Sequence, residues 1–318
     1  MAMRRPQRNA IWRMVASEGG AGARTAALGL GLCCLHCSSD DSTHKDVTTD
    51  ITGDGDSGKK DDTDKGPVVI DGVKCGAMLD DKLASPFTMV DGRKVFIDYP
   101  CNLEKGSPVT FVLNLHGTQS VEDGKHYIRE YNKLGENSQK YGFVVATPIS
   151  IGSQWGNGDN GQDAPYLADV VDWVYSSFSG YDIKQMWVTG HSWGAAYSLS
   201  FVCKPEYADK IRGLLFMSGG ASLPQCADRL SIIATVGETD IVPGQPDQST
   251  IAAGHGCDAR SERTMGQDKV SEWANCDRGW VHQDYLMLGK GHGFNPIDWP
   301  DTDMTTAIAE AVHATQPE

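Results

Sequence analysis

Positive charge is scarce in this chain. Its 318 residues include 28 lysines and arginines against 42 aspartates and glutamates, which gives a formal net charge of −14. Binding to nucleic acid needs clustered lysine and arginine side chains against the phosphates, so this balance argues against a nucleic-acid partner. Much of the acidic excess lies in an aspartate-rich stretch near the N-terminus, where it solvates a tail and says little about a functional site.

Closely spaced cysteine pairs are missing from most of the chain. Three of the nine cysteines crowd an N-terminal apolar segment, and the other six contain no CxxC pair, which argues against a zinc ribbon or a thioredoxin-type site. Separated cysteines in an exported chain indicate disulfide bonds, and six cysteines allow fifteen pairings. We expect sequence neighbours to pair, with buried free thiols as the alternative. The expected pairs are Cys75–Cys101, Cys203–Cys226 and Cys257–Cys276.

A long apolar run is also lacking. The stretch at residues 26–35 is too short to span a bilayer as a helix, and it follows several arginines, which is typical of an export signal. Three cysteines near its end, Cys33, Cys34 and Cys37, indicate a lipoprotein-type signal, in which one cysteine carries a lipid after cleavage. Secretion without a lipid is the alternative. We expect residues 1–37 to be a signal peptide, and the protein to be secreted or attached to the membrane by this lipid, on the bacterial cell surface or in the periplasm.

Residues 38–67 have almost no large apolar side chains. Such a segment cannot bury enough surface to offset its ordering entropy, so we expect a disordered tether rich in Asp, Ser and Gly. The remaining residues, 68–318, suffice for one large domain.

Short apolar runs alternate with helical patterns along this domain. The alternation indicates an α/β fold with a mostly parallel central sheet and helices on both faces. Predicted strands lie at 95–99, 109–115, 143–146, 186–189, 214–217, 232–236 and 285–288, and predicted helices at 167–178, 195–202 and 302–313.

The strongest local motif is Gly190-His191-Ser192-Trp193-Gly194, which follows a predicted strand and precedes a predicted helix. This is the context of the nucleophile elbow of α/β-hydrolases. The glycines are needed because the backbone turns sharply there, and the helix N-terminus favours negative charge in the transition state. The motif therefore predicts that Ser192 is a catalytic nucleophile.

A serine nucleophile needs a base and an acid that orients the base, and in this fold the chain order is nucleophile, acid, base. Asp240 lies just beyond the predicted strand at 232–236, so we expect it to be the acid, with Glu238 and Asp247 as rivals. His292 follows the last predicted strand between two glycines and is the expected base, with His255 as the other contender.

An oxyanion hole needs two hydrogen-bond donors. The first is the backbone N–H of Trp193, after the nucleophile, and the second comes from the loop after an early strand, where we choose Thr118, with Gly117 as the alternative. His116 is expected to brace this loop and to contact the substrate, and not to take part in the chemistry itself. Trp155, in a glycine-rich loop, is expected to form a wall of the substrate cleft, with ordinary loop packing as the alternative.

The order and spacing of these motifs resemble secreted esterases of the polyhydroxybutyrate depolymerase and feruloyl esterase type, over roughly residues 75–300. The matching segments are Leu113-Asn114-Leu115-His116-Gly117, Val188-Thr189-Gly190-His191-Ser192, Gly237-Glu238-Thr239-Asp240 with Val242-Pro243, Gly256-Cys257 to Trp273-Ala274-Asn275-Cys276, and Gly291-His292. The resemblance implies an α/β-hydrolase that cleaves esters through an acyl-enzyme without a metal or organic cofactor. It also supports a disulfide between Cys257 and Cys276.

The substrate is the least transferable part of the resemblance, because the chain departs from the family at two segments that border the pocket, Trp193-Gly194-Ala195 and Phe294-Asn295-Pro296. We expect a monomer that hydrolyses an extracellular polymer or an aryl or acyl ester, such as a polyhydroxyalkanoate, feruloyl or acetyl ester. The alternatives are a serine peptidase or amidase of the same fold, a non-catalytic surface lipoprotein, and a nucleophile at Ser218, which also follows a strand.

Overall fold

The computed structural model describes residues 69–70, 73–75, 87–119, 127–156, 161–220, 222–242, 247–292 and 302–315. The expected signal peptide at 1–37 and the tether at 38–67 lie outside the described residues. They stay predictions, as does the start of the folded domain at residue 68.

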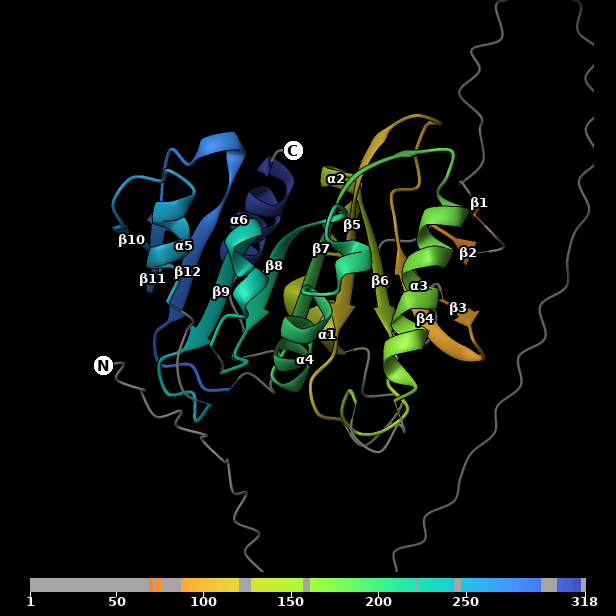
Figure 1. The fold of residues 1–318 in the computed structure, drawn as a ribbon, viewed down its shortest axis with the longest axis horizontal. Helices are drawn as coiled ribbons and strands as arrows, with labels where there is room; N and C mark the ends of the chain where they lie inside the picture. Colours follow the sequence, from red (N-terminus) through yellow and green to blue (C-terminus); the bar gives the residue numbers. More distant parts are fainter. Residues whose placement is uncertain are drawn as a thin grey trace, which may run out of the picture. The chain divides into compact units, whose positions relative to one another are not determined.

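Ten strands form one sheet within the described ranges, in the order β10-β11-β12-β9-β8-β7-β5-β6-β4-β3 (Figure 1). From β12 to β6 in this order, neighbouring strands pair in parallel. At each end of the sheet, the two outermost strands each pair antiparallel with their neighbours. Their bounds are β3 (Phe87–Val90), β4 (Arg93–Asp98), β5 (Pro108–Leu115), β6 (Phe143–Pro148), β7 (Asp182–His191), β8 (Ile211–Met217), β9 (Ser231–Gly237), β10 (Ser261–Met265), β11 (Asp268–Trp273) and β12 (His282–Met287). Two shorter strands, β1 (Val69–Ile70) and β2 (Val73–Lys74), pair with each other.

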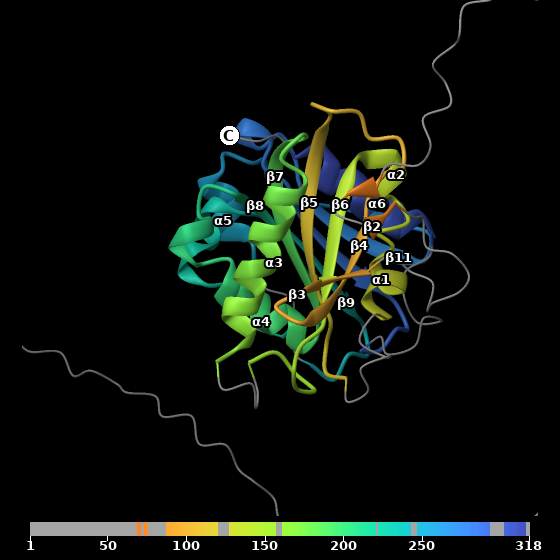
Figure 2. The same cartoon turned by 90° about the vertical axis from the view of Figure 1, so that its right-hand side faces the viewer.

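Helices cover both faces of the sheet (Figure 2). On one face lie α3 (Asp163–Ser177), α4 (Trp193–Phe201) and α5 (Ser249–Gly254), and on the other lie α1 (Tyr127–Asn132), α2 (Ser138–Tyr141) and α6 (Thr302–Ala314). Because both faces are covered, every residue of β8 and β9 is buried, and each strand contains a short apolar run, 214–217 in β8 and 232–234 in β9. This arrangement confirms the predicted α/β-hydrolase fold.

The predicted strands and helices are present, but one predicted boundary is wrong and several elements were not predicted, among them β3, α1, α2, α5 and the hairpin of β10 and β11. The hairpin of β10 and β11 was not expected, because β10 is an edge strand whose five residues are mostly exposed and polar, so it carries no apolar pattern. The last strand begins at His282 rather than at Tyr285. His282 is therefore a buried strand residue, not part of a preceding loop.

The three expected disulfides are confirmed: Cys75–Cys101, Cys203–Cys226 and Cys257–Cys276. The last of them joins the two segments that flank the β10–β11 hairpin, so it closes the chain around this edge of the sheet. Disulfides persist in oxidising surroundings and are rare in the cytosol, which is consistent with a location outside the cytoplasm. In the part of the chain that the structure describes, no helix has the length and apolar character needed to cross a membrane.

A buried ion pair fixes the short helix α1 against the sheet. Arg129 donates to Asp98 of β4 from Nε to Oδ2 at 2.9 Å and from Nη2 to Oδ1 at 2.5 Å, and both side chains are almost fully buried. Asn132, in the same helix, donates to Asn114 of β5 at 2.9 Å. Because a six-residue helix is not stable by itself, these contacts determine where α1 lies.

Replacing Arg129 by methionine should destabilise the fold strongly, because it leaves the Asp98 carboxylate buried without its charge partner. We expect a loss of about 3–5 kcal/mol in the free energy of unfolding, measured by urea denaturation with tryptophan fluorescence. The matched control is Lys140→Met, which breaks an ion pair with Glu310 whose side chains are 62% and 59% exposed. This control should leave the urea midpoint close to that of the wild type, because solvent screens an exposed ion pair. Equal losses in the two variants would contradict the anchoring role of Arg129.

Candidate active site

The candidate site lies where two neighbouring strands send their connections in opposite directions. β5 and β7 are adjacent in the sheet although β6 lies between them in the chain. The chain after β5 enters α1 on one face, and the chain after β7 enters α4 on the other (Figure 2). Ligands of open α/β sheets bind at such a point, outside the carboxyl ends of the strands. Gly117 follows β5 and Ser192 follows β7, so both lie at this position.

Ser192 forms a sharp turn between β7 and α4. Its φ of 54° and ψ of −118° lie in a region that non-glycine residues rarely adopt. A Cβ at Gly190 would overlap the backbone of Gly194, and a Cβ at Gly194 would overlap the carbonyls of Leu115 and His116. The two glycines of the motif are therefore required by close backbone packing around the serine.

Three separate loops bring a serine, a histidine and an aspartate together. The Nε2 atom of His292 lies 2.8 Å from Ser192 Oγ, and its Nδ1 atom lies 2.8 Å from Asp240 Oδ1. Asp240 Oδ1 also accepts a hydrogen bond of 2.8 Å from the backbone N–H of Val242, which orients the carboxylate. The Asp240 side chain is 1% exposed and that of His292 is 11% exposed, so the histidine is the more accessible of the two.

The loops that carry Asp240 and His292 are tied to each other by their backbones. Thr239 donates to the Lys290 carbonyl twice, from its N–H at 2.8 Å and from its hydroxyl at 2.9 Å. A Cβ at Gly237 would overlap the carbonyls of Lys290 and Gly291, so only glycine lets the two loops approach this closely. No pattern in the sequence indicated that Thr239 and Gly237 hold these loops together.

The rival acids and the rival base have other partners. The Glu238 carboxylate accepts from the Gly289 N–H at 2.9 Å, and Asp247 accepts from the Ser249 N–H at 2.9 Å. His255 is buried and lies 2.8 Å from His282 and 2.6 Å from the Asp228 carbonyl. Each of these side chains therefore has a local structural contact.

The rival nucleophile Ser218 does not share this geometry. Its side chain is 2% exposed, and its hydroxyl has no hydrogen-bond partner among the described residues. Ser218 also has a positive φ of 50°, but it lacks a neighbouring base.

The loop after β5 passes directly beside Ser192, since a Cβ at Gly117 would lie 3.1 Å from the Ser192 Cβ. The Gly117 N–H donates to the hydroxyl of Tyr127 at 2.8 Å, which occupies the alternative oxyanion donor. Within the described ranges, the N–H groups of Thr118 and Trp193 donate to no residue. These are the two N–H groups predicted from the sequence as oxyanion donors.

His116 and Trp155 lie inside the protein and not at an open cleft. His116 is fully buried, and its ring contacts the Gly117 carbonyl at 2.6 Å and accepts from the Ser150 N–H at 3.1 Å. Trp155 is 1% exposed, and its indole N–H donates to the His116 carbonyl at 2.8 Å. Their burial argues against the expected substrate contacts, and both residues brace the loop after β5.

Exposed apolar side chains flank the three-residue cluster. Trp193, next to Ser192, is 41% exposed, and Ile241, next to Asp240, is 89% exposed. The Trp193 indole N–H donates to the Trp155 carbonyl at 2.8 Å, which fixes the ring beside the elbow.

His191 is a residue of this site whose role the sequence did not indicate. It is fully buried, with Nδ1 2.7 Å from the Tyr127 hydroxyl and Nε2 2.8 Å from the His292 carbonyl. The Tyr131 hydroxyl lies 3.2 Å from the same Nε2 atom. Burial lowers the pKa of His191 to about 3, so the ring is neutral near neutral pH.

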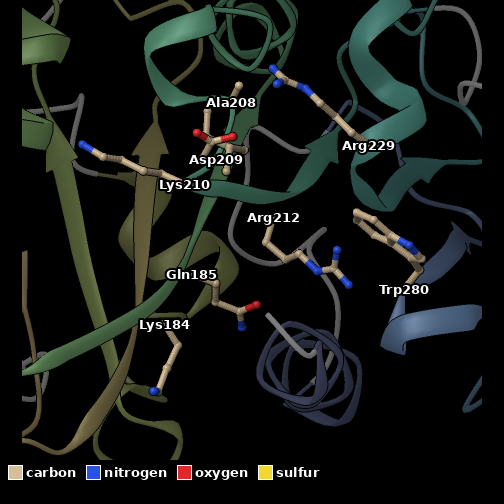
Figure 3. Close-up of a pocket in the computed structure, with 9 residues that line it drawn as sticks. Lys184, Gln185, Ala208, Asp209, Lys210, Arg212, Arg229 and Trp280 are labelled. Carbon is tan, nitrogen blue, oxygen red and sulfur yellow. The ribbon is translucent and has the colours of Figure 1, made fainter. Parts of the chain in front are cut away.

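A different cavity, of about 370 Å³, lies at the opposite edge of the sheet, near the amino ends of β7 and β8. Its lining includes Lys184, Lys210, Arg212, Arg229 and Trp280. In Figure 3 the Arg212 side chain points towards Trp280, whereas the two lysine side chains point away from the centre of the group. The guanidinium carbon of Arg212 lies 3.3 Å from the centre of the Trp280 ring. None of these residues belongs to the cluster around Ser192.

Comparisons with known proteins identify folds but no family. No family model matches this chain, and no curated protein is similar to it. The chain is similar to a lidless α/β serine hydrolase from Xanthomonas campestris, with 19% identity and a TM-score of 0.45, over 73% of this chain and 95% of that one. For the esterase Est2 from Thermogutta terrifontis the identity is 15% and the TM-score 0.42, over 72% and 91% of the two chains. For Est1E from Butyrivibrio proteoclasticus, which has also been solved with ferulic acid, the identity is 14% and the TM-score 0.40, over 71% of this chain and 95% of that one. At these identities the likeness concerns the fold alone.

The neutral state of His191 predicts a pH dependence of stability. Its folded pKa of about 3 lies below the value of about 6.5 in an unfolded chain. Below pH 6.5 the unfolded chain therefore binds a proton that the folded protein does not, and the stability that His191 contributes above pH 6.5 is lost as the pH falls towards 3. We expect the stability difference between wild type and His191→Asn to shrink by about 1.4 kcal/mol per pH unit between pH 6 and 5. Urea denaturation at each pH measures it, and a constant or widening difference would contradict the prediction.

Proposed function

We propose that this protein is a serine hydrolase that cleaves carboxylic ester bonds through an acyl-enzyme. The observation that carries the proposal is the position of one imidazole between two partners. His292 has Ser192 Oγ at 2.8 Å from one ring nitrogen and Asp240 Oδ1 at 2.8 Å from the other. This is the geometry in which a histidine acts as a general base towards a serine while an aspartate orients it.

In the proposed reaction, Ser192 Oγ attacks the ester carbonyl and its proton passes to His292 Nε2. The N–H groups of Trp193 and Thr118 donate to the resulting oxyanion, and Asp240 holds the Nδ1–H tautomer and stabilises the imidazolium. The C–O bond to the alcohol then breaks, and the alcohol leaves with the proton from Nε2. Water attacks the acyl-enzyme in the same way, the carboxylic acid leaves, and Ser192 regains its proton.

The surroundings of the nucleophile favour a substrate with an apolar part. The exposed side chains of Trp193 and Ile241 stand next to Ser192 and Asp240 and offer apolar surface to an acyl or alcohol group. We therefore infer an aryl or acyl ester, or a polymer built from such esters, as the substrate. A peptidase or amidase of the same fold is the alternative, because the same three residues serve both reactions.

We further propose that the protein works as a monomer outside the bacterial cytoplasm, either secreted or held on the cell surface or in the periplasm by an N-terminal lipid. Three disulfides support export, since such bonds are rare in the cytosol.

Two substitutions test the roles of the cluster. Ser192→Ala should reduce ester turnover roughly 10⁶-fold because it removes the attacking oxygen. Asp240→Asn should reduce kcat roughly 10⁴-fold because it favours the wrong imidazole tautomer. Both variants should unfold at nearly the wild-type urea concentration. Steady-state kinetics with a nitrophenyl ester measure the effect, and substantial turnover by Ser192→Ala would refute the assignment.

A substrate panel separates the proposed esterase from its alternatives. We expect the full-length protein to cleave nitrophenyl esters of some chain length, methyl ferulate or a polyester film, in each case only when Ser192 is present. Cleavage of peptide amides at a higher kcat/KM than any ester would favour the peptidase. Failure of a folded protein to react with a fluorophosphonate probe would favour a binding protein without catalysis.

A further inference from the structure

A chain of hydrogen bonds runs behind Ser192 and joins the loop after β5 to the loop that carries His292. Gly117 N–H lies 2.8 Å from the Tyr127 hydroxyl, this hydroxyl lies 2.7 Å from His191 Nδ1, and His191 Nε2 lies 2.8 Å from the His292 carbonyl. Two residues, Tyr127 and His191, therefore connect the elements that hold the oxyanion and the base.

The groups at the two ends of this chain determine where its protons lie. The Gly117 N–H can only donate, so the Tyr127 oxygen accepts from it and gives its own proton to His191 Nδ1. The His292 carbonyl can only accept, so the second ring nitrogen of His191 must carry a proton. His191 is thus the neutral Nε2–H tautomer.

We propose that Tyr127 and His191 are positioning residues of the reaction, a role that rests on the function proposed above. Tyr127 holds the Gly117 N–H and so leaves Thr118 to face the oxyanion. His191 holds the backbone of His292 and so keeps its imidazole aimed at Ser192.

The neighbouring groups show why His191 and Tyr127 have to be uncharged. The rings of His191 and His292 lie 5.1 Å apart, so a positive charge on His191 would oppose the imidazolium that forms on His292 during catalysis. Burial lowers the pKa of His191 to about 3 and raises that of Tyr127, which keeps both groups uncharged. The charge of Asp240 acts in the opposite direction to burial and raises the pKa of His191, but its effect is smaller, and Asp240 Oδ1 lies 2.8 Å from His292 Nδ1.

The helix that carries Tyr127 is itself fixed. The Arg129–Asp98 pair anchors α1 to β4, and Asn132 binds β5 through Asn114. Tyr131, one turn further along α1, places its hydroxyl 3.2 Å from His191 Nε2 and 3.4 Å from the His292 carbonyl. Contacts with the sheet therefore fix the helix that carries Tyr127.

The first test removes one hydroxyl and compares it with a matched hydroxyl elsewhere. Tyr127→Phe keeps the ring but frees Gly117 N–H and His191 Nδ1, and we expect kcat to fall about 10- to 100-fold with KM changed less than about threefold. The control is Tyr166→Phe in α3, where a buried tyrosine donates to the Lys94 carbonyl at 2.9 Å, away from the site. Both variants should lower Tm by a few degrees, roughly to the same extent. A Tyr127→Phe enzyme with wild-type kcat and only the Tm loss of the control would overturn the proposal.

The second test separates the two hydrogen bonds of His191, one with the Tyr127 hydroxyl and one with the His292 carbonyl. Asparagine at this position can reach the Tyr127 hydroxyl but not the His292 carbonyl, whereas glutamine can reach the carbonyl but not the hydroxyl. We expect both His191→Asn and His191→Gln to slow the reaction of Ser192 with a fluorophosphonate probe at least about tenfold, because each variant keeps only one of the two hydrogen bonds. Wild-type labelling rates in both variants would refute the proposal.

A third measurement does not depend on any substrate. In the full-length protein, ¹⁵N NMR of the imidazoles should show His191 as the neutral Nε2–H tautomer at every pH from 8 to 5. A doubly protonated ring or an Nδ1–H tautomer would contradict the proposed chain of hydrogen bonds through Tyr127 and His191. If the wild type labels at Ser192 but cleaves no ester, the ester assignment fails, and the labelling rates still test the positioning role of Tyr127 and His191. If the wild type does not label at all, the catalytic function fails and the positioning role fails with it, whatever the tautomer of His191.

Discussion

The backbone at Ser192 turns with a φ of 54°, and the packing around it depends on holding this conformation. A non-glycine residue in such a region costs about 1–3 kcal/mol, so neighbouring structure must compensate. The compensation is visible in the contacts: Gly190 and Gly194 let the backbones of β7, α4 and the loop after β5 touch, and the Ser192 N–H donates to the Met217 carbonyl at 2.9 Å. The serine is thereby presented between two strands whose connections diverge.

The same principle extends to the other two residues of the cluster. Asp240 and His292 are 52 residues apart in the chain, yet Thr239 and the Lys290 carbonyl join their loops by two hydrogen bonds. Backbone contacts thus place both side chains before any substrate arrives. Preorganisation of this kind is what electrostatic catalysis requires, because donors and charges that are already oriented need no rearrangement during the reaction.

Several buried aromatic and histidine side chains around the site position its loops without contacting the reacting atoms. Trp155 and His116 hold the loop after β5 from one side, and Tyr127 holds it from the other. In the sequence these residues look like candidates for a substrate cleft or for ordinary core positions. Only burial and the direction of each hydrogen bond distinguish a brace from a contact with substrate, and neither can be read from spacing.

Much of the fold was predictable from the sequence, because the central strands of the parallel sheet are buried on both faces and each contains a short segment rich in apolar residues. The elbow at Ser192 was predictable because its glycines are a local steric requirement, and the sequence determined the order of serine, aspartate and histidine at successive strand ends. The edge strand β10 was not predictable, since its exposed polar residues carry no periodic signal. What only the tertiary structure decided is which residues meet: that His292 lies between Ser192 and Asp240, and that Tyr127 and His191 join the loop after β5 to the His292 backbone. These contacts join segments far apart in the chain, and the packing of helices on both faces of one sheet brings them together.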